Sequence, residues 1–338
     1  MSRNRALVSR DCPTPTKAGA QLPCARQTGV SLRRRLRRCW APAFAGVGVN
    51  VAMLLSGCVT ARQYNDIEGP PIVAPSPSPP PAPTTAVPPA YQFLYGSGEA
   101  GAMQQAAFHA LIAYVEAKVA NRPANSVVLA AGSPMVRASF VPCGAKPLAA
   151  VFDADETVIL NTGFEAWAAT GVPYSDAEWA DWERTGTVAV VPGAAHAFED
   201  LRKAGVTVVV NSNRSTANAT ATAASLKAAG LGDFRPGETL FTRDAGAPSG
   251  KDARRQAIAA RYCVVAMAGD QLGDFSDLFN APMPVAARRQ LAVHSSAAGL
   301  WGKGWFVLPN PVYGTALRGG ADDVFPGQRW APSAGARP

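Results

Sequence analysis

The sequence predicts an α/β fold: a parallel β-sheet with helices on both faces and a small helical cap. The first indication is that short apolar runs, typical of strands buried on both faces, alternate with helical segments. The second is that three of these runs end directly in polar clusters. Because the carboxyl ends of parallel strands meet at one edge of a sheet, we expect these polar side chains to form a single site.

The strand that organises the sheet is expected at residues 148–152, where five apolar residues lead directly into Asp153 and Asp155. We expect the chain to turn here and to bring both carboxylates to the same edge of the sheet, at the opening of the site. Two acids this close repel each other, and without a compensating charge one of the two would take up a proton. A divalent cation would hold both charges and leave one carboxylate free to act as a nucleophile.

Helical spacing of apolar residues predicts a helix over residues 101–120, which ends before Pro123. Ser175 and Glu178 form a capping box that predicts the start of a short helix. In the sequence this helix lies between the first two strands, within residues 158–190. A cap that covers the site is expected in this segment.

The remaining elements follow from apolar runs and from their Pro and Gly boundaries. In chain order they are a helix from Pro192 to Gly205, a strand at 206–210 followed by the polar run 211–215, a helix at 216–229, a strand at 239–241, a helix at 251–262, a strand at 263–268 followed by Asp270 and Asp274, and a strand at 305–308.

The positive charge of the chain is concentrated at its N-terminus. Residues 1–57 contain ten Lys or Arg residues and one acid, whereas the other 281 residues contain 22 basic and 23 acidic side chains. The formal net charge of +8 therefore belongs to the N-terminus. No basic surface for a nucleic acid polymer is implied for the rest of the chain.

A signal peptide with a lipobox is expected at residues 1–57. An Arg cluster precedes an uncharged stretch that ends in Leu55-Ser56-Gly57-Cys58, and this order of basic, apolar and small residues is typical of a signal peptide. The last four residues resemble the lipobox of bacterial lipoproteins, in which the Cys is lipidated. A transmembrane anchor is the alternative, but the apolar stretch is short and broken by Pro and Gly. We therefore expect Cys58 to attach the chain to the lipid bilayer. Because Val59 follows it rather than Asp, the lipoprotein sorting rule implies the outer membrane, with the domain in the periplasm.

Residues 58–90 are expected to form a tether, residues 91–330 a folded domain and residues 331–338 a flexible tail. From Gly69 to Pro89 the chain is rich in Pro and has no apolar periodicity. Such a composition favours extended polyproline II and cannot pack a core.

Six polar residues far apart in the sequence each lie just beyond a strand or at a helix start. They are Asp153, Asp155, Ser212, Lys251, Asp270 and Asp274. A hard cation such as Mg²⁺ prefers oxygen ligands, and a phosphate needs hydrogen-bond donors, so this set suits both. Any one of the acids alone could be a helix cap or a solvated surface charge.

Four motifs and a C-terminal block also carry a resemblance to a known family. They are Val-Phe-Asp153-Ala-Asp155-Glu-Thr157, Asn211-Ser212-Asn213-Arg214, Lys251-Asp-Ala-Arg254-Arg255, Gly269-Asp270-Gln-Leu-Gly-Asp274-Phe275 and the block from Trp301 to Gly314. From about Tyr91 to Arg318 the chain resembles the haloacid dehalogenase (HAD) superfamily, and within it the class C bacterial acid phosphatases, which include the lipoprotein 5′-nucleotidases.

The resemblance implies Mg²⁺-dependent hydrolysis of phosphate monoesters through an aspartyl-phosphate. Asp153 would be the nucleophile, and Asp155 would protonate the leaving oxygen and then activate water. Ser212 and Lys251 would hold the phosphoryl group.

The same resemblance implies a metal site. Asp270, with Asp153 and the backbone carbonyl of Asp155, would bind Mg²⁺, and Asp274 would support it. Arg254 and Arg255 are expected as helix-surface charges rather than ligands.

The substrate is expected to be a 5′-nucleotide. Phe164, Tyr313 and, as a third candidate, Trp179 could supply aromatic surface for the leaving group, and Asn213 is expected to contact the substrate. A nucleobase stacks well on such surfaces whatever its identity. The alternative is that these aromatics are packing residues of the cap. Leu160 and Phe164 depart from the family pattern, where an acid and a Tyr are expected.

Two other functions stay open. One is dehalogenation by a related enzyme, although a halide leaving group needs no acid such as Asp155. The other is a non-enzymatic surface lipoprotein that uses the fold as a binding scaffold. Mg²⁺-dependent release of phosphate from an aryl phosphate distinguishes the main hypothesis from both.

Besides Cys58, Cys143 and Cys263 are the only cysteines left after signal removal. In an oxidising periplasm they are candidates for a disulfide. The family resemblance makes their strands neighbours, but their offsets differ by three residues, so the bridge requires Gly144 and Pro147 to bend the first segment back. The alternative is two buried thiols.

Overall fold

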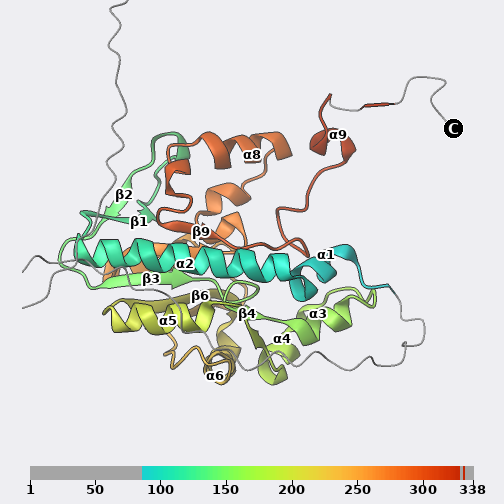
Figure 1. Ribbon diagram of the computed structural model, residues 1–338, viewed down its shortest axis with the longest axis horizontal. Coiled ribbons are helices and arrows are strands. Elements are labelled where there is room, and N and C mark those ends of the chain that lie inside the picture. Colours follow the sequence, from blue (N-terminus) through green and yellow to red (C-terminus); the bar gives the residue numbers. More distant parts are fainter. Residues whose placement is uncertain (1–85, 328–329, 332–338) are drawn as a thin grey trace, which may run out of the picture. The chain divides into compact units, whose positions relative to one another are not determined.

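The computed structural model describes residues 86–327 and 330–331 (Figure 1). The expected signal peptide, Cys58, most of the tether and the tail beyond residue 331 lie outside the described residues. Within the described ranges, no helix combines the length and the apolar composition that a bilayer crossing requires.

A five-stranded parallel sheet forms the centre of the fold, with the strand order β7-β6-β3-β8-β9. The strands are β3 (Leu148–Phe152), β6 (Thr207–Ser215), β7 (Leu240–Arg243), β8 (Cys263–Gly269) and β9 (Trp305–Val307). The predicted parallel sheet is therefore confirmed. Because β3 is the central strand, Asp153 at its carboxyl end lies between the ends of β6 and β8.

The second strand is longer than predicted. The polar residues after Val210 belong to β6 itself, where Asn211 pairs with Phe241 and Ser215 with Arg243 of β7. The apolar run ends at Val210 because the side chains beyond it leave the core and face the site. Hydropathy therefore identified the buried part of the strand and not its end.

Both faces of the sheet are covered, and the side chains of β3 alternate between two apolar clusters. Phe152 packs against Phe108 of α2 (Gly98–Ala120) and Phe198 of α5 (Ala194–Lys203), with ring centroids 6.4 and 4.6 Å away. Val151 points to the other face, in a cluster with Ile258 of α7 (Asp252–Arg261). Helix α6 (Ala219–Ala228) adds Leu226 to the first cluster. Such alternation is expected of a strand buried on both sides.

Helix α2 begins at Gly98, three residues earlier than predicted, because Ser97 caps it by accepting a hydrogen bond from the backbone N of Ala100 at 3.1 Å. The helix runs alongside the sheet (Figure 1). Two residues of the predicted apolar stripe, Met103 and Val119, are 52% and 38% exposed. The buried face is therefore narrower than the periodicity indicated.

The segment predicted as the cap folds as β4 (Ile159–Leu160), α3 (Thr162–Ala168), α4 (Asp176–Thr185) and β5 (Ala189–Val190). The N-cap half of the predicted capping box is formed, since Ser175 Oγ accepts a hydrogen bond from Glu178 N at 3.3 Å. Helix α3 and the antiparallel β4–β5 pair were not predicted. Both helices lie near α1 (Pro89–Tyr91) at one end of the sheet (Figure 1).

Several further elements were not predicted. They are the antiparallel hairpin of β1 (Asn125–Leu129) and β2 (Phe140–Pro142), α8 (Val285–His294) and α9 (Ala321–Val324). Neither α8 nor α9 contains a fully buried residue. Their sequences therefore lack the apolar stripe by which a surface helix is recognised.

Cys143 and Cys263 form a disulfide with a Cα–Cα distance of 4.6 Å, so of the two alternatives left open by the sequence the bridge is the one observed. The required bend is present at Gly144, whose φ of 53° lies in the left-handed region that glycine adopts without strain. The turn lets Cys263 donate its backbone N–H to Pro147 O at 2.8 Å. The disulfide thereby ties the segment before β3 to the first residue of β8.

Candidate active site

Asp153 is held at the end of β3 by the sheet and by a lysine. Its backbone N still donates to Ala268 O of β8 at 2.9 Å. Lys251, directly before α7, places Nζ 2.5 Å from Asp153 Oδ1 and 2.7 Å from Asp274 Oδ1. One ammonium group therefore bridges two carboxylates that come from different motifs.

Asp270 completes a group of three carboxylates. One oxygen each from Asp153, Asp270 and Asp274 lies within 4.8 Å of the others. Asp270 Oδ1 accepts from Thr157 Oγ1 at 3.0 Å, and Oδ2 accepts from Asn310 Nδ2 at 2.8 Å. The Asp270 carboxylate is thus fixed in orientation from two sides.

Asp274 does two things at once. Its Oδ1 accepts from Lys251, while Oδ2 accepts from the backbone N of Gln271 at 2.9 Å and caps the short turn that begins there. The sequence suggested either a helix cap or a metal-supporting residue, and the two carboxylate oxygens allow both.

Burial and mutual repulsion dominate the electrostatics of this group. Burial raises the pKa of Asp153 well above its usual range; Lys251 opposes this, and the neighbouring acids add to it. Burial raises the pKa of Asp270 to about 7, with a further contribution from the Asp274 charge and opposition from the Asn310 hydrogen bond. Burial lowers the pKa of Lys251, but the Asp153 and Asp274 charges outweigh burial and keep the lysine protonated.

These residues fit a divalent metal ion. One ammonium does not compensate three buried carboxylates, as the raised pKa values show. Oxygen ligands of this kind suit a hard cation. The three carboxylates therefore form a candidate metal site.

Asp155, two residues after Asp153, has a different environment. Its Oδ1 accepts hydrogen bonds from Arg214 Nε and from Asn161 Nδ2, each at 2.9 Å, and forms an ion pair with Arg214 Nη2 at 2.8 Å. Arg214 is almost fully buried, with a side-chain exposure of 1%. The Asp155 carboxylate lies outside the group of three, so of the predicted metal contributions only its backbone carbonyl is compatible with this orientation.

Glu156 anchors the turn between β3 and β4. It has a φ of 54°, a left-handed conformation that non-glycine residues rarely adopt. Its buried carboxylate accepts from Tyr95 OH at 3.2 Å, from Tyr313 OH and from the backbone N of Asn161 at 2.9 Å. Burial raises the pKa of Glu156 to about 7, and the Asp155 charge adds to this.

Ser212 and Asn213 come from β6. Ser212 is fully buried, and its Oγ accepts from the backbone N of Arg214 at 3.0 Å. Asn213 is half-buried, and its Oδ1 accepts from Arg254 Nη2 at 2.5 Å. Arg254 Nε also donates to Asn211 Oδ1 at 2.8 Å. The expectation that Arg254 is a helix-surface charge is wrong, because its guanidinium turns toward the end of β6.

The same expectation is wrong for Arg255, which is 1% exposed. It forms ion pairs with Asp252 and, at 2.8 Å, with Asp277. Asp277 Oδ1 also accepts from the backbone N of Lys251 at 2.8 Å. Arg255 and Asp277 therefore fix the start of α7, from which Lys251 reaches the carboxylates.

The two predicted aromatic contacts differ in exposure. Phe164 of α3 is 7% exposed, and Trp167, Tyr174, Trp179 and Trp182 surround its ring with centroid distances of 4.9 to 6.3 Å. Much of the Phe164 surface is therefore packed against other aromatic residues of the cap, as the packing alternative expects. Tyr313 is 36% exposed, while its hydroxyl is turned inward to Glu156.

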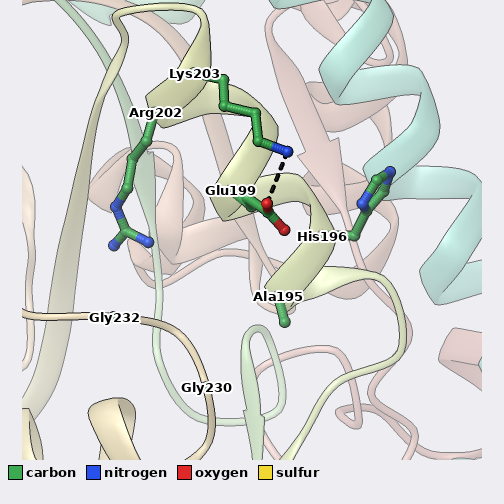
Figure 2. A pocket seen from close by; sticks show the side chains of 7 residues that line it. All are labelled: Ala195, His196, Glu199, Arg202, Lys203, Gly230 and Gly232. Carbon is green, nitrogen blue, oxygen red and sulfur yellow. Dashed lines mark ion pairs between the residues drawn. The ribbon is translucent and has the colours of Figure 1, made fainter.

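Two surface hollows lie apart from the carboxylates. One is lined by Gly163, Phe164, Trp167, Ala177, Glu178, Asp181, Trp182 and Thr185, between α3 and α4 of the cap. The other is formed by α5 and the loop after α6, where Lys203 reaches back to Glu199 and Arg202 points away from both (Figure 2). The hollow on α5 contains none of the predicted site residues.

The comparisons with known proteins agree with this arrangement. The sequence matches the family described as HAD superfamily, subfamily IIIB (Acid phosphatase), over residues 102–316. A structure of the class C acid phosphatase from Bacillus anthracis is similar, with 23% identity, a TM-score of 0.55, and coverage of 67% of this chain and 84% of that chain. A tungstate-bound structure of a class C acid phosphatase from the same organism has 22% identity, a TM-score of 0.55, and coverage of 72% and 90%. These two likenesses are of fold. Comparison with curated protein sequences gave no match.

Sequence reasoning assigned no role to the residues that hold Asp155 and Asp270. Arg214 was part of a recognised motif, and its place in a polar run at a strand end was a usable signal. Glu156 and Asn310 also lie in recognised motifs and Asn161 does not, but the partners of all three are known only once the chain is folded.

Proposed function

The chain belongs to the HAD superfamily, subfamily IIIB (acid phosphatases), and on that basis we propose that it is a Mg²⁺-dependent phosphomonoesterase that works through an aspartyl-phosphate on Asp153. The observation that carries this proposal is that the neighbouring acids Asp153 and Asp155 lie in different environments. Asp153 joins the carboxylate group with Lys251, whereas Asp155 is held apart by Arg214. Two carboxylates in contrasting environments can perform two different steps.

In the first step, an oxygen of Asp153 attacks the phosphorus atom of the ester. As the bond between phosphorus and the leaving oxygen breaks, Asp155 gives its proton to that oxygen, and a neutral alcohol or phenol departs. Lys251 and Ser212 would donate hydrogen bonds to the phosphoryl oxygens.

In the second step, Asp155 takes a proton from a water molecule as the water oxygen attacks the phosphorus of the aspartyl-phosphate. The bond between phosphorus and Asp153 breaks, the carboxylate of Asp153 is restored, and phosphate leaves. Asp155 ends protonated, as it began.

Asp153, Asp270 and the backbone carbonyl of Asp155 would hold the Mg²⁺, with Asp274 in support. The cation supplies charge neutralisation between these carboxylates and the phosphate. Lys251 keeps Asp153 and Asp274 in place before substrate arrives.

The direct test is phosphate release from p-nitrophenyl phosphate by the purified domain. We expect turnover with Mg²⁺ and none after EDTA treatment. A well-folded protein without turnover under both conditions would favour the non-enzymatic scaffold instead.

We propose 5′-nucleotides as the substrates, with the nucleobase against the exposed ring of Tyr313. Tyr313→Ala removes ring and hydroxyl, whereas Tyr313→Phe removes only the hydrogen bond to Glu156. If stacking matters, Tyr313→Ala lowers the ratio of nucleoside monophosphate to phenyl phosphate turnover by roughly 5- to 100-fold, and Tyr313→Phe preserves it. An unchanged ratio in Tyr313→Ala would refute the stacking.

We also propose that the chain is an outer-membrane lipoprotein anchored at Cys58, with its domain in the periplasm. The sequence around Cys58 supports this proposal. A Cys58→Ser protein should leave the membrane fraction in a carbonate wash, whereas the unchanged chain should stay. Retention of Cys58→Ser in the washed membranes would argue against the lipid anchor.

A further inference from the structure

The cap contacts the proposed acid through one short chain of hydrogen bonds. Trp182 of α4 donates its indole Nε1–H to Asn161 Oδ1 at 2.8 Å. Asn161 in turn donates Nδ2–H to Asp155 Oδ1 at 2.9 Å. The amide of Asn161 therefore links a cap side chain directly to the carboxylate that protonates the leaving group.

Asn161 has only one orientation that satisfies its neighbours. It is fully buried, and its Oδ1 accepts from Arg214 Nη2 at 2.7 Å as well as from Trp182. Its Nδ2 faces acceptors only, Asp155 and both oxygens of Glu156 at 3.2 Å. Exchanging the amide oxygen and nitrogen would set donors against donors, so Trp182 and Arg214 together fix the amide.

Two glycines pack directly against the indole of Trp182. A Cβ on Gly163 would be 2.7 Å from the ring carbon Cη2, and Gly186 approaches the ring even more closely. Any larger residue at either glycine would displace the indole. The two glycines therefore allow α4 to place the indole N–H on Asn161.

The hydrogen bonds at Asp155 are one-sided. Within the described part of the chain, Oδ1 accepts one hydrogen bond from Arg214 Nε and one from Asn161 and lies 2.8 Å from Arg214 Nη2, whereas no donor reaches Oδ2. An oxygen that accepts two hydrogen bonds and also contacts a guanidinium is the poorer place for a proton. The proton that is transferred to the leaving oxygen therefore belongs on Oδ2.

We propose that Trp182 is a positioning residue which, through Asn161, turns Oδ2 of Asp155 toward the leaving oxygen and so makes the docking of the cap helix a condition for leaving-group protonation. This inference rests on the proposed function. A positioning error of about 1 Å can cost about 100-fold in rate, so the loss of one fixing bond is a measurable change.

The test compares two esters that differ in how much they need an acid. Phenyl phosphate has a basic leaving group that needs protonation, whereas dinitrophenyl phosphate has a leaving group that departs as the anion. The parameter kcat/KM reports only the steps up to leaving-group departure. Trp182→Phe keeps the ring between the two glycines and removes the N–H donor.

We expect Trp182→Phe to lower kcat/KM for phenyl phosphate by roughly 10- to 100-fold and that for dinitrophenyl phosphate less than about twofold. Asn161→Ala should shift the ratio in the same direction, and it replaces Trp182→Phe if that variant does not fold. A merely structural role would reduce the active fraction and lower both values equally. Equal losses in the folded variant, or no loss, would overturn the proposal.

Trp301→Phe is the matched control. It also removes one indole N–H bond, to Ala292 O at 2.7 Å, and it touches no residue of this chain of hydrogen bonds. Its ratio between the two esters should equal that of the wild type, and a shift as large as that of Trp182→Phe would overturn the proposal. Failure of the wild type to hydrolyse either ester would contradict the proposed function itself, which is a different result from an unchanged ratio.

Discussion

Asp153 and Asp155 are the same residue type two positions apart, yet the fold gives their carboxylates opposite surroundings. Asp153 shares a lysine with Asp274 and lies beside Asp270, in a region of excess negative charge. Asp155 is held by an arginine and an amide, with Glu156 as a neighbouring carboxylate. The comparison teaches that environment, rather than residue type, distinguishes the residue proposed as nucleophile from the residue proposed as acid.

The two regions are connected to different parts of the chain. The Asp153 region is built on β3, β8 and the start of α7, which belong to the sheet and its covering helix. The Asp155 region reaches into the cap through Asn161 and Trp182. Metal binding should therefore depend on the sheet, and leaving-group protonation on the cap.

The largest effect is expected from removing the nucleophile. Asp153→Asn should lower kcat for p-nitrophenyl phosphate by about 10⁴-fold or more, because no other group can form the phosphoenzyme. The control is Asp233→Asn, the same change at a carboxylate that is 79% exposed. If Asp153→Asn turned over at a rate close to that of the control, Asp153 would not be the nucleophile and the proposed difference between the two regions would be wrong.

Removal of the metal should act on the Asp153 region alone. EDTA should abolish turnover and Mg²⁺ should restore it, because the uncompensated carboxylates repel the phosphate. At 100 times its Kd, Mg²⁺ should also stabilise the fold by about 2.7 kcal/mol, measurable as a rise in Tm. Asp270→Asn should lose this rise. A rise as large as that of the wild type in Asp270→Asn would place the metal elsewhere.

A smaller effect is expected from Arg214→Lys, which keeps the charge but cannot contact Asp155 through both Nε and Nη2. We expect kcat to fall roughly tenfold or more, while the Mg²⁺-dependent rise in Tm stays as in the wild type. Loss of that rise would show that the two regions are coupled more tightly than their separate contacts indicate.

The smallest effect on catalysis is expected from the disulfide, which joins the segments that lead into β3 and β8 at the ends remote from the acids. Replacing Cys143 and Cys263 by Ser should lower the free energy of unfolding by about 4 to 5 kcal/mol in the chain-entropy model. Urea unfolding measures this loss, and kcat should change less than about twofold provided the protein is folded. Thiol titration of the denatured chain without reductant should find no reactive thiol in residues 59–338, and two would contradict the bridge.

Much of the sheet was predictable because the two central strands β3 and β8 are buried on both faces and end abruptly. Val151 and Phe152 lead into Asp153, and Ala268 leads into Gly269 and Asp270, so the strand ends and the acids were visible together. The polar end of β6 was not, because its residues continue the strand while they face the site. Helix α3 escaped prediction because a seven-residue helix shows too little periodicity.

The carboxylates of the site were predictable and the groups that orient them were not. Arg255 carries the same charge as any surface arginine, and its burial depends on Asp277, which follows it by 22 residues. Asn161 is an amide in a cap segment, and its function depends on contacts with Arg214 and Trp182. Such roles arise from the tertiary structure, which spacing in the sequence does not encode.

The most direct test of the division between the two acids is the mass of each variant after an acid quench with p-nitrophenyl phosphate. This ester has a good leaving group, so the phosphoenzyme can form without the acid but cannot be hydrolysed without the base. We predict one added phosphoryl group per chain in Asp155→Asn and none in Asp153→Asn. A phosphoryl group on Asp153→Asn, or none on either variant, would contradict the assignment of nucleophile and acid.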